Sequence, residues 1–269
     1  MKKYKRVLTI AGSDPSGGAG IQADLKTFSA CGCFGTSAIV AVVDENTVGV
    51  TGVHPIPVDF VTGQIKSVLD DIGADAIKIG MLHSSELIRA VKETLSRYDI
   101  KDIVLDPVMV ATSGDKLLQD EAIETLKNEL IPYARIITPN FPEAEVLLGR
   151  KINGQEEMPL VIRELSAGGK VSVVLKGGHL EDDLMMDVFY NAESDEVIKI
   201  ISERIDTRNT HGTGCTFSSA IAAFLAHSFT LNEAVREAKE YINSAILQGA
   251  DYEIGKGHGP VHHFFKFWD

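Results

Sequence analysis

Short runs of β-branched and aliphatic residues recur along the chain, separated by longer amphipathic segments. The runs predict strands at Arg6–Ile10, Thr36–Val42, Ala76–Ile79, Asp102–Leu105, Arg135–Ile137 and Val171–Leu175. The segments between them predict helices at Ala19–Ala30, Phe60–Asp70, Ser85–Tyr98, Asp120–Leu130 and Glu156–Ala167. Strands that alternate with helices build a mostly parallel sheet, because a right-handed crossover connects each parallel pair. The pattern therefore predicts an α/β fold with helices on both faces of a central sheet.

The pattern changes in the last third of the chain. Val188–Tyr190 and Val197–Ile201 flank the polar turn 191–195, which predicts an antiparallel hairpin at one edge of the sheet. Two long segments with an apolar face, Gly214–Ala226 and Leu231–Gln248, predict a pair of helices near the C-terminus. The parallel order is therefore expected only among the earlier strands.

A second hairpin is predicted near the other end of the chain. Val48, Val50 and Val53 alternate with other residues inside Asp44–Val58, as in a two-stranded flap that covers a site. No Pro/Ser-rich linker, low-complexity tract or internal repeat interrupts the sequence. One domain over residues 1–269 is therefore expected.

The composition fits a globular protein and narrows the choice of partners. The chain has 269 residues, 44% of them hydrophobic and 24% charged, and its formal net charge is −12. A negative protein lacks the excess of Lys and Arg that neutralises phosphates, so neither nucleic acid nor an anionic membrane is an expected partner. A small-molecule substrate is expected, and any phosphate it carries must meet a locally positive site.

Cysteine use and the N-terminus both favour the cytoplasm. The three cysteines, two of them in Cys31-Gly32-Cys33, are too few for a disulfide framework and odd in number. The apolar stretch Val7–Ala11 is much shorter than the core of a signal peptide. No segment reaches the roughly 18 apolar residues of a membrane span. The protein is therefore expected in the cytoplasm.

A glycine-rich loop, Ala11–Gly20, joins the first strand to the first helix. Glycines allow left-handed backbone and let a ligand approach main-chain N–H groups. The loop lacks the Lys-Ser/Thr ending of a P-loop and the glycine spacing of an NAD-linked dehydrogenase, so a plain tight turn stays an alternative. Its place at the carboxyl end of a strand favours a ligand site. Gly12 and Asp24 are expected to bracket the substrate pocket.

A second glycine-rich loop, Asp206–Phe217, opens the first of the two C-terminal helices. The N–H groups of Gly212, Thr213, Gly214 and Cys215 would form an anion hole at the helix N-terminus, which suits a phosphoryl group in transfer. The same position lowers the pKa of a thiol, so we expect Cys215 to have thiolate character. The alternative is a small buried core residue, as most free cysteines are.

Polar residues at two strand ends add to the candidate site. Lys176 follows an apolar strand and is the best candidate for a cationic contact to phosphates, with a solvated lysine as the alternative. Asp106 ends another strand and has the oxygen ligands that a hard cation prefers, with an ordinary turn residue as the alternative. The loop histidines His179 and His211 either make polar contacts near the ligands or are incidental.

Five segments, in order over nearly the whole chain, carry a resemblance to a known family. They are Ala11–Thr27, Asp106-Pro107-Val108-Met109, Thr138–Glu145, Lys176-Gly177-Gly178-His179 and His211–Phe217. They resemble the hydroxymethylpyrimidine/phosphomethylpyrimidine kinases of thiamine biosynthesis, in the ribokinase-like superfamily, which has a similar branch of pyridoxal kinases. The resemblance implies a ribokinase-like fold, a central sheet sandwiched by helices, without a separate lid domain.

The resemblance also implies a reaction and its partners. The family uses ATP and Mg²⁺ and is commonly homodimeric. It phosphorylates the hydroxymethyl group of 4-amino-5-hydroxymethyl-2-methylpyrimidine and then adds a second phosphate to the monophosphate. Both steps are phosphoryl transfers, so one anion hole can serve both.

Individual roles follow from the matched motifs. Most ribokinase-like enzymes have an aspartate base after the Gly-Thr/Ala-Gly motif, so the resemblance makes Cys215, which stands there, the catalytic base. The Asn-x-x-Glu motif assigns Asn140 to the phosphate side and Glu143 to Mg²⁺ through water, with a plain helix cap as the alternative. The residues assigned to ATP are Asn140, Lys176 and Thr210, and those assigned to the metal are Glu143 and Asp106.

One position departs from the family pattern. The family has Gln-Asn-Thr in the flap, and its Gln gives the aminopyrimidine a donor and an acceptor, whereas this chain has Glu45-Asn46-Thr47. An ionised Glu only accepts hydrogen bonds, so Glu45 faces a ring lone pair unless the ring or Glu45 is protonated. A pyridoxal-type vitamin kinase is therefore the alternative. A non-catalytic pyrimidine- or nucleotide-binding regulator is disfavoured by the complete set of candidate anion hole, base and metal residues.

Overall fold

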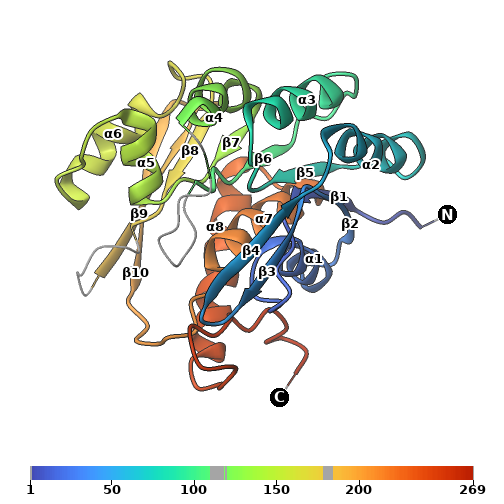
Figure 1. The fold of residues 1–269 in the computed structure, drawn as a ribbon. Helices are drawn as coiled ribbons and strands as arrows, with labels where there is room; N and C mark the ends of the chain where they lie inside the picture. Colours follow the sequence, from blue (N-terminus) through green and yellow to red (C-terminus); the bar gives the residue numbers. More distant parts are fainter. Residues whose placement is uncertain (1, 110–117, 119, 178–183, 269) are drawn as a thin grey trace.

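The computed structural model describes residues 2–109, 118, 120–177 and 184–268, and an eight-stranded sheet lies at its centre (Figure 1). The strand order is β10-β9-β8-β7-β6-β5-β1-β2. The strand bounds are β1 Arg6–Ala11, β2 Phe34–Ile39, β5 Ala76–Ile79, β6 Ile103–Leu105, β7 Ile136–Ile137, β8 Ser172–Leu175, β9 Leu184–Asn191 and β10 Glu196–Glu203. The strands from β8 to β2 are parallel, and β9 and β10 pair antiparallel at one edge. The predicted mostly parallel sheet with an edge hairpin is confirmed.

Helices cover both faces of this sheet, as Figure 1 shows. Their bounds are α1 Gly20–Ala30, α2 Val58–Asp71, α3 Ser85–Leu95, α4 Asp120–Thr125, α5 Phe141–Leu148, α6 Met158–Glu164, α7 Thr213–Ala226 and α8 Leu231–Gly249. Leu8 and Ile10 of β1 pack in a core with α2 to α6, whereas Val7 packs in a second core with α1, α7 and α8. Successive side chains of a strand point to opposite faces, so one strand contributes to both cores.

Helix α7 lies against the middle of the sheet. It is buried on nearly all sides, including the whole run Phe217–Ala223. Its small side chains allow close packing against β5 and β6 on one side and against α1 and α8 on the other. The start of α7 is thereby held near the carboxyl ends of the parallel strands.

The predicted strand Thr36–Val42 is wrong in one respect, because it contains parts of two sheets. β2 leaves the main sheet at Ile39, whose N–H and C=O both bond to the side chain of Gln64 at 3.0 Å. The chain continues as β3 Ala41–Asn46, which pairs antiparallel with β4 Gly49–Pro55 in a separate two-stranded sheet. We call residues 41–55 the flap. The apolar alternation continues through the bend, so the pattern could not locate it.

Three predicted helices end earlier than expected, and one observed helix had no predicted range. Asp120–Leu130 is α-helical only to Thr125 and continues as a π-helical turn. Ser85–Tyr98 ends at Leu95, and Glu156–Ala167 ends at Glu164. The helix without a predicted range is α5, although a helix cap at Asn140 was one of the two interpretations, and Asn140 does cap it. Within the described residues, no helix combines the length and hydrophobicity that crossing a bilayer requires.

Candidate active site

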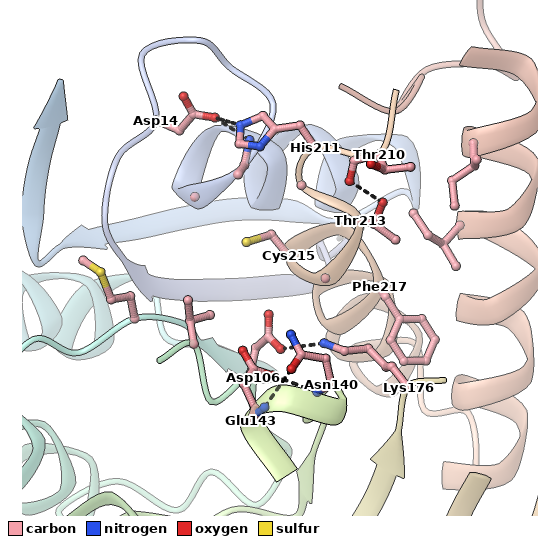
Figure 2. A pocket seen from close by; sticks show the side chains of 18 of the residues that line it. Asp14, Asp106, Asn140, Glu143, Lys176, Thr210, His211, Thr213, Cys215 and Phe217 are labelled. Atoms are coloured by element: carbon pink, nitrogen blue, oxygen red, sulfur yellow. Dashed lines mark hydrogen bonds and ion pairs between the residues drawn. The ribbon is translucent and has the colours of Figure 1, made fainter. Parts of the chain in front are cut away.

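A cavity of about 800 Å³ opens at the carboxyl ends of the parallel strands. It is bounded by the loop after β1, the flap, the start of α7 and polar residues that follow β6, β7 and β8 (Figure 2). Open α/β sheets bind ligands at this edge. Every predicted site residue except Asp24 lines the cavity: Gly12, Glu45, Asp106, Asn140, Glu143, Lys176, Thr210, Gly212, Thr213, Gly214 and Cys215.

Asp24 lies behind the cavity wall. Its side chain is fully buried, and it accepts hydrogen bonds from Lys78 Nζ at 2.9 Å, Thr9 Oγ1 at 2.6 Å and Ser219 Oγ at 2.7 Å. These internal partners occupy the carboxylate, so a substrate does not reach it. The prediction that Asp24 brackets the substrate is wrong, because α1 directs this side chain into the core.

The first turn of α7 faces the cavity. Within the described part of the chain, no side chain caps this helix, and its N-cap Gly212 has φ 76°. Thr213 Oγ1 donates instead to the carbonyl of Thr210 at 2.7 Å. A Cβ at position 212 would clash with the carbonyl oxygen of Gly18, so glycine allows the two loops to touch. The N–H groups of this turn and the helix dipole together make an anion site.

Lys176 places a positive charge beside this anion site. A Cβ added at Gly214 would lie 3.3 Å from Lys176 Nζ and 3.5 Å from Asp106 Oδ2. Lys176 Nζ donates to Asp106 Oδ1 at 3.2 Å, and its side chain is only 16% exposed, which excludes a solvated strand-end lysine. Burial alone would lower the pKa of Lys176, but the charges of Asp106 and Glu143 raise it. The cation is therefore permanent.

Asn140 and Glu143 cap α5 and line the cavity at the same time. Asn140 Oδ1 accepts from the N–H of Glu143 at 2.9 Å, and Glu143 Oε2 accepts from the N–H of Asn140 at 2.8 Å. This reciprocal capping box confirms the cap interpretation, and it holds Glu143 in place with 4% exposure. Burial raises the pKa of Glu143 to about 7, with Asp106 adding to the effect and Lys176 opposing it.

Asp106 and Glu143 suit a magnesium ion that keeps most of its water. The part of the chain that the structure describes contains no group of three or more His, Cys, Asp or Glu side chains arranged to hold a metal ion. Mg²⁺ needs only one or two protein carboxylates, because it retains water and binds substrate phosphates. Asp106 and Glu143 both line the cavity and both offer carboxylate oxygens, so the pair fits a divalent cation.

Cys215 lies in the first turn of α7, where burial opposes the ionisation of its thiol. Burial raises the pKa of the Cys215 thiol to about 11. The Lys78 charge and the N–H of Gly20 act to lower it, whereas Asp24 and Asp106 act to raise it. Loss of solvation therefore opposes the expected thiolate character in this site, whereas Lys78 and the N–H of Gly20 favour it.

Lys78 is a cavity residue that the sequence did not reveal. It is fully buried in β5 and paired with Asp24, yet it also lines the cavity. Burial alone would lower the pKa of Lys78, but Asp24, Cys215 and Asp106 raise it. The sequence does not show that a lysine inside an apolar strand lies at a cavity wall, because its partner carboxylate, Asp24, comes from a helix far away in the chain.

The flap and the loop after β1 form the other end of the cavity. A Cβ on Gly12 would lie 3.2 Å from Met81 Cε and 3.8 Å from Val43 Cγ2, so these three cavity residues pack together as one wall. We call the part of the cavity between this wall and Glu45 the slot. A register shift between Asp44 and Glu45 interrupts the β3–β4 pairing, and such bulges re-aim side chains. Glu45 lines the cavity with its side chain 17% exposed. Glu45 therefore offers a carboxylate to a ligand at this end of the cavity.

Asp14 and His211 form a buried pair beside this slot (Figure 2). Asp14 is 1% exposed and His211 6% exposed, and His211 Nε2 lies 2.9 Å from Asp14 Oδ2. His211 is therefore not an incidental loop residue. The sequence could not reveal the pair, because its members are 197 positions apart. His179, the other histidine considered, lies outside the described residues.

An apolar region bounds the cavity beyond α7. Phe217, Ile242 and Ile246 line it, and the pair Lys239 Nζ to Asp187 Oδ2 at 2.7 Å stands at its side. Apolar walls with a few polar groups are typical of sites for planar heterocycles. The cavity therefore has two regions of different chemistry, one on each side of the α7 N-terminus, and each region offers a place for a ligand.

Comparison with known proteins gives a consistent result. Residues 14–262 match the family model described as phosphomethylpyrimidine kinase. A hydroxymethylpyrimidine/phosphomethylpyrimidine kinase of Salmonella typhimurium is 48% identical over 262 residues, which cover 97% of this chain and 98% of that protein.

Two solved structures have the same fold. The ADP complex of Bacillus subtilis pyridoxal kinase superposes with a TM-score of 0.90 at 38% identity, covering 99% of this chain and 100% of that one. The phosphomethylpyrimidine kinase of Clostridium difficile superposes with a TM-score of 0.78 at 44% identity, covering 90% and 99%. The expected ribokinase-like class of fold is thereby confirmed.

Proposed function

The chain belongs to the phosphomethylpyrimidine kinase family, and we propose that it transfers the γ-phosphoryl of ATP first to hydroxymethylpyrimidine and then to its monophosphate. The product is the pyrimidine diphosphate used in thiamine biosynthesis. The proposal covers residues 1–269 as one kinase domain.

The observation that carries the proposal is the uncapped start of α7 beside Lys176. Phosphoryl transfer requires positioned reactants and stabilisation of charge on the transferred group. The N–H groups at Gly214 and Cys215 supply donors, whereas that of Thr213 already donates to the carbonyl of Thr210 at 3.3 Å. Lys176 supplies a cation 3.3 Å from a Cβ built at Gly214. The transferred phosphoryl would occupy this place in both reactions.

The two ligands take opposite ends of the cavity. The ATP base would lie near Phe217 and Ile242, with its phosphates reaching Thr210, Asn140 and Lys176. The pyrimidine would lie in the slot between Gly12 and the flap. Asp106 and Glu143 would hold Mg²⁺, which neutralises phosphate charge when bound.

Cys215 is the proposed proton acceptor in the first transfer only. The hydroxymethyl oxygen must lose a proton, and Lys78 is the cation that favours a Cys215 thiolate. In the second transfer the acceptor is a phosphate monoester, whose second pKa is about 6, so it arrives ionised. The second transfer therefore needs no base, and the two reactions should depend on Cys215 to different extents.

We extend the proposal to a homodimer in the cytoplasm. The flap exposes Val42 and Val48 outside the cavity, and a second copy would cover these apolar side chains. The three cysteines are free, as a reducing compartment requires. Light scattering after gel filtration should give about twice the chain mass of 29.1 kDa, and a mass of one chain would contradict the dimer.

A pyridoxal kinase is the second candidate. It is favoured by Glu45 at the slot and by the likeness to the Bacillus subtilis pyridoxal kinase. Pyridoxal offers a readily protonated ring nitrogen and a phenolic oxygen, and both can meet a carboxylate.

The test is a phosphorylation assay with MgATP and three acceptors: hydroxymethylpyrimidine, its monophosphate and pyridoxal. We expect the two pyrimidines to have the higher kcat/KM values. A higher kcat/KM for pyridoxal would select the second candidate. Nucleotide binding without turnover on any acceptor would indicate a non-catalytic binding protein.

A further inference from the structure

Three ionisable groups from separate segments meet at the slot. Asp14 lies in the loop after β1, Glu45 in the flap and His211 in the loop before α7. His211 Nε2 is 2.9 Å from Asp14 Oδ2 and 4.0 Å from Glu45 Oε1. All three residues line the cavity, so a ligand in the slot changes the surroundings of each.

Asp14 is the fixed negative charge of this group. The N–H groups of Ser16, Gly18 and Ala19 donate to it at 2.7, 3.0 and 2.6 Å. Burial alone would raise the pKa of Asp14, but the bonds from His211, Ser16 and Ala19 lower it. Asp14 therefore stays ionised and holds His211 as its donor.

Glu45 and His211 are the groups that titrate. Burial raises the pKa of Glu45, and the charge of Asp14 raises it further, whereas charged His211 acts to lower it. Burial alone would lower the pKa of His211, but the bond to Asp14 and the charges of Asp14 and Glu45 raise it. Both pKa values are therefore raised above the ordinary values, which are near 4 for a carboxyl and near 6.5 for an imidazole.

The remaining ionisable neighbours come from α1 and the C-terminal segment. Lys26 of α1 donates to the carbonyl of Gly17 at 2.7 Å, on the same loop as Asp14. Burial lowers the pKa of His263 to about 3, and Lys26 and His262 act in the same direction. His263 is therefore neutral, and it accepts or donates one bond with Thr216 at 3.0 Å.

The chemistry of the ligand defines what Glu45 must supply. The edge of an aminopyrimidine presents a ring nitrogen that accepts and an exocyclic amine that donates. A protonated carboxyl matches both, and a carboxylate facing a protonated ring makes the same two contacts. An ionised Glu45 facing a neutral ring makes only one, because two lone pairs oppose each other. The paired state therefore contains one proton between Glu45 and the ring.

We propose that Glu45 selects the aminopyrimidine edge through one bound proton, and that the Asp14–His211 pair sets the pH at which that proton is held. The inference rests on the proposed function. When Glu45 is ionised in the free protein and the ring is neutral, binding takes one proton from solvent. The new O–H or N–H bond breaks on release, and the proton returns to solvent.

The sign of the pH effect follows directly. The complex contains one proton that the free partners lose as the pH rises. Binding must then take this proton from solvent, so the affinity falls as the pH rises. The dependence is at most about tenfold in Kd per pH unit for one proton. A glutamine at position 45 carries a donor and an acceptor at every pH, so it abolishes the dependence.

The experiment is isothermal titration calorimetry of the full chain with hydroxymethylpyrimidine, from about pH 6 to about pH 9, in two buffers of different ionisation enthalpy. For the wild type, we expect Kd to increase with pH and the uptake to approach one proton per ligand in the alkaline range. For Glu45→Gln, we expect a flat Kd and no uptake. His211→Asn should move the onset of uptake to higher pH, because it removes the charge that lowers the pKa of Glu45.

Asp44→Asn is the matched control, because Asp44 precedes Glu45 on the same strand but is exposed outside the cavity. This variant should titrate like the wild type. A wild-type Kd without pH dependence or proton uptake, in a protein that phosphorylates the pyrimidine, overturns the inference. If no pyrimidine is phosphorylated at any pH, the proposed function fails instead.

Discussion

The two ends of the cavity are built differently. At the transfer end, Asp106, Asn140 and Lys176 follow strands of the central sheet, and hydrogen bonds or ion pairs hold each of them. At the slot, Glu45 lies on a two-stranded flap outside that sheet, and its Oε1 is 4.0 Å from His211 Nε2. The central sheet therefore positions the residues for phosphoryl transfer. A substitution in the flap can alter substrate specificity without disturbing that sheet.

The largest expected effect separates the two transfers at one residue. Cys215→Ala should lower kcat for hydroxymethylpyrimidine by about 10²- to 10⁴-fold, the range for loss of a general base. It should lower kcat for the monophosphate by less than about tenfold, because that acceptor is already ionised. Steady-state kinetics with both acceptors make the measurement.

Cys33→Ala is the control, because burial raises the pKa of Cys33 to about 11 as it does for Cys215. Cys33 lies in the second core, outside the cavity, so its loss should leave both rates unchanged. Equal losses for the two acceptors in Cys215→Ala would show that Cys215 is not a base.

The next effect tests whether the transfer end serves both reactions. Lys176→Met should lower kcat for both acceptors by about 10²- to 10³-fold, since it removes the cation beside the transferred group. Lys170→Met is the control, because exposed Lys170 precedes β8 at its other end. A loss confined to one acceptor would mean that the two transfers use different places.

A smaller effect concerns the metal. Glu143→Gln should raise the Mg²⁺ concentration for half-maximal rate by about 10- to 100-fold, while the glutamine preserves the capping box of α5. Titration of the rate with Mg²⁺ gives this value. Glu233→Gln changes the equivalent residue of the α8 capping box, outside the cavity, and should have no effect. An unchanged Mg²⁺ requirement in Glu143→Gln would remove Glu143 from the metal site.

The smallest effect belongs to the slot. Gly12→Ala should raise KM for the pyrimidine by several-fold and leave kcat nearly unchanged, because the new methyl group meets Met81 Cε at 3.2 Å. Met81 is flexible, so it can move by a few tenths of an ångström. A loss of kcat without a change in KM would mean that the slot also positions the transfer.

The sequence predicted most strands closely because each is a short buried apolar run. The prediction for β5 coincides with the observed Ala76–Ile79, and those for β6, β7 and β8 differ by one residue at one end. Parallel strands buried on both faces leave this signal. The bend between β2 and β3 left no such signal in the sequence, because the apolar alternation continues through it and suits either sheet.

The site was predictable where residues lie together in the chain. The α7 loop, Asn140 with Glu143, and Lys176 all line one cavity, as the motifs indicated. The pKa of Cys215 was not predictable, because it depends on burial by several distant segments. The pairs of Asp24 with Lys78 and of Asp14 with His211 were missed for the same reason, since neither partner marks the other in the sequence.

The central claim is that one transfer end carries out both phosphorylations. It is tested most directly by ³¹P NMR of the purified chain with MgATP and hydroxymethylpyrimidine as the only acceptor. We predict that a monophosphate signal appears first and is then replaced by the two coupled signals of a diphosphate ester, while ADP accumulates. A time course that stops at the monophosphate, or that shows only ADP and inorganic phosphate, would contradict the account.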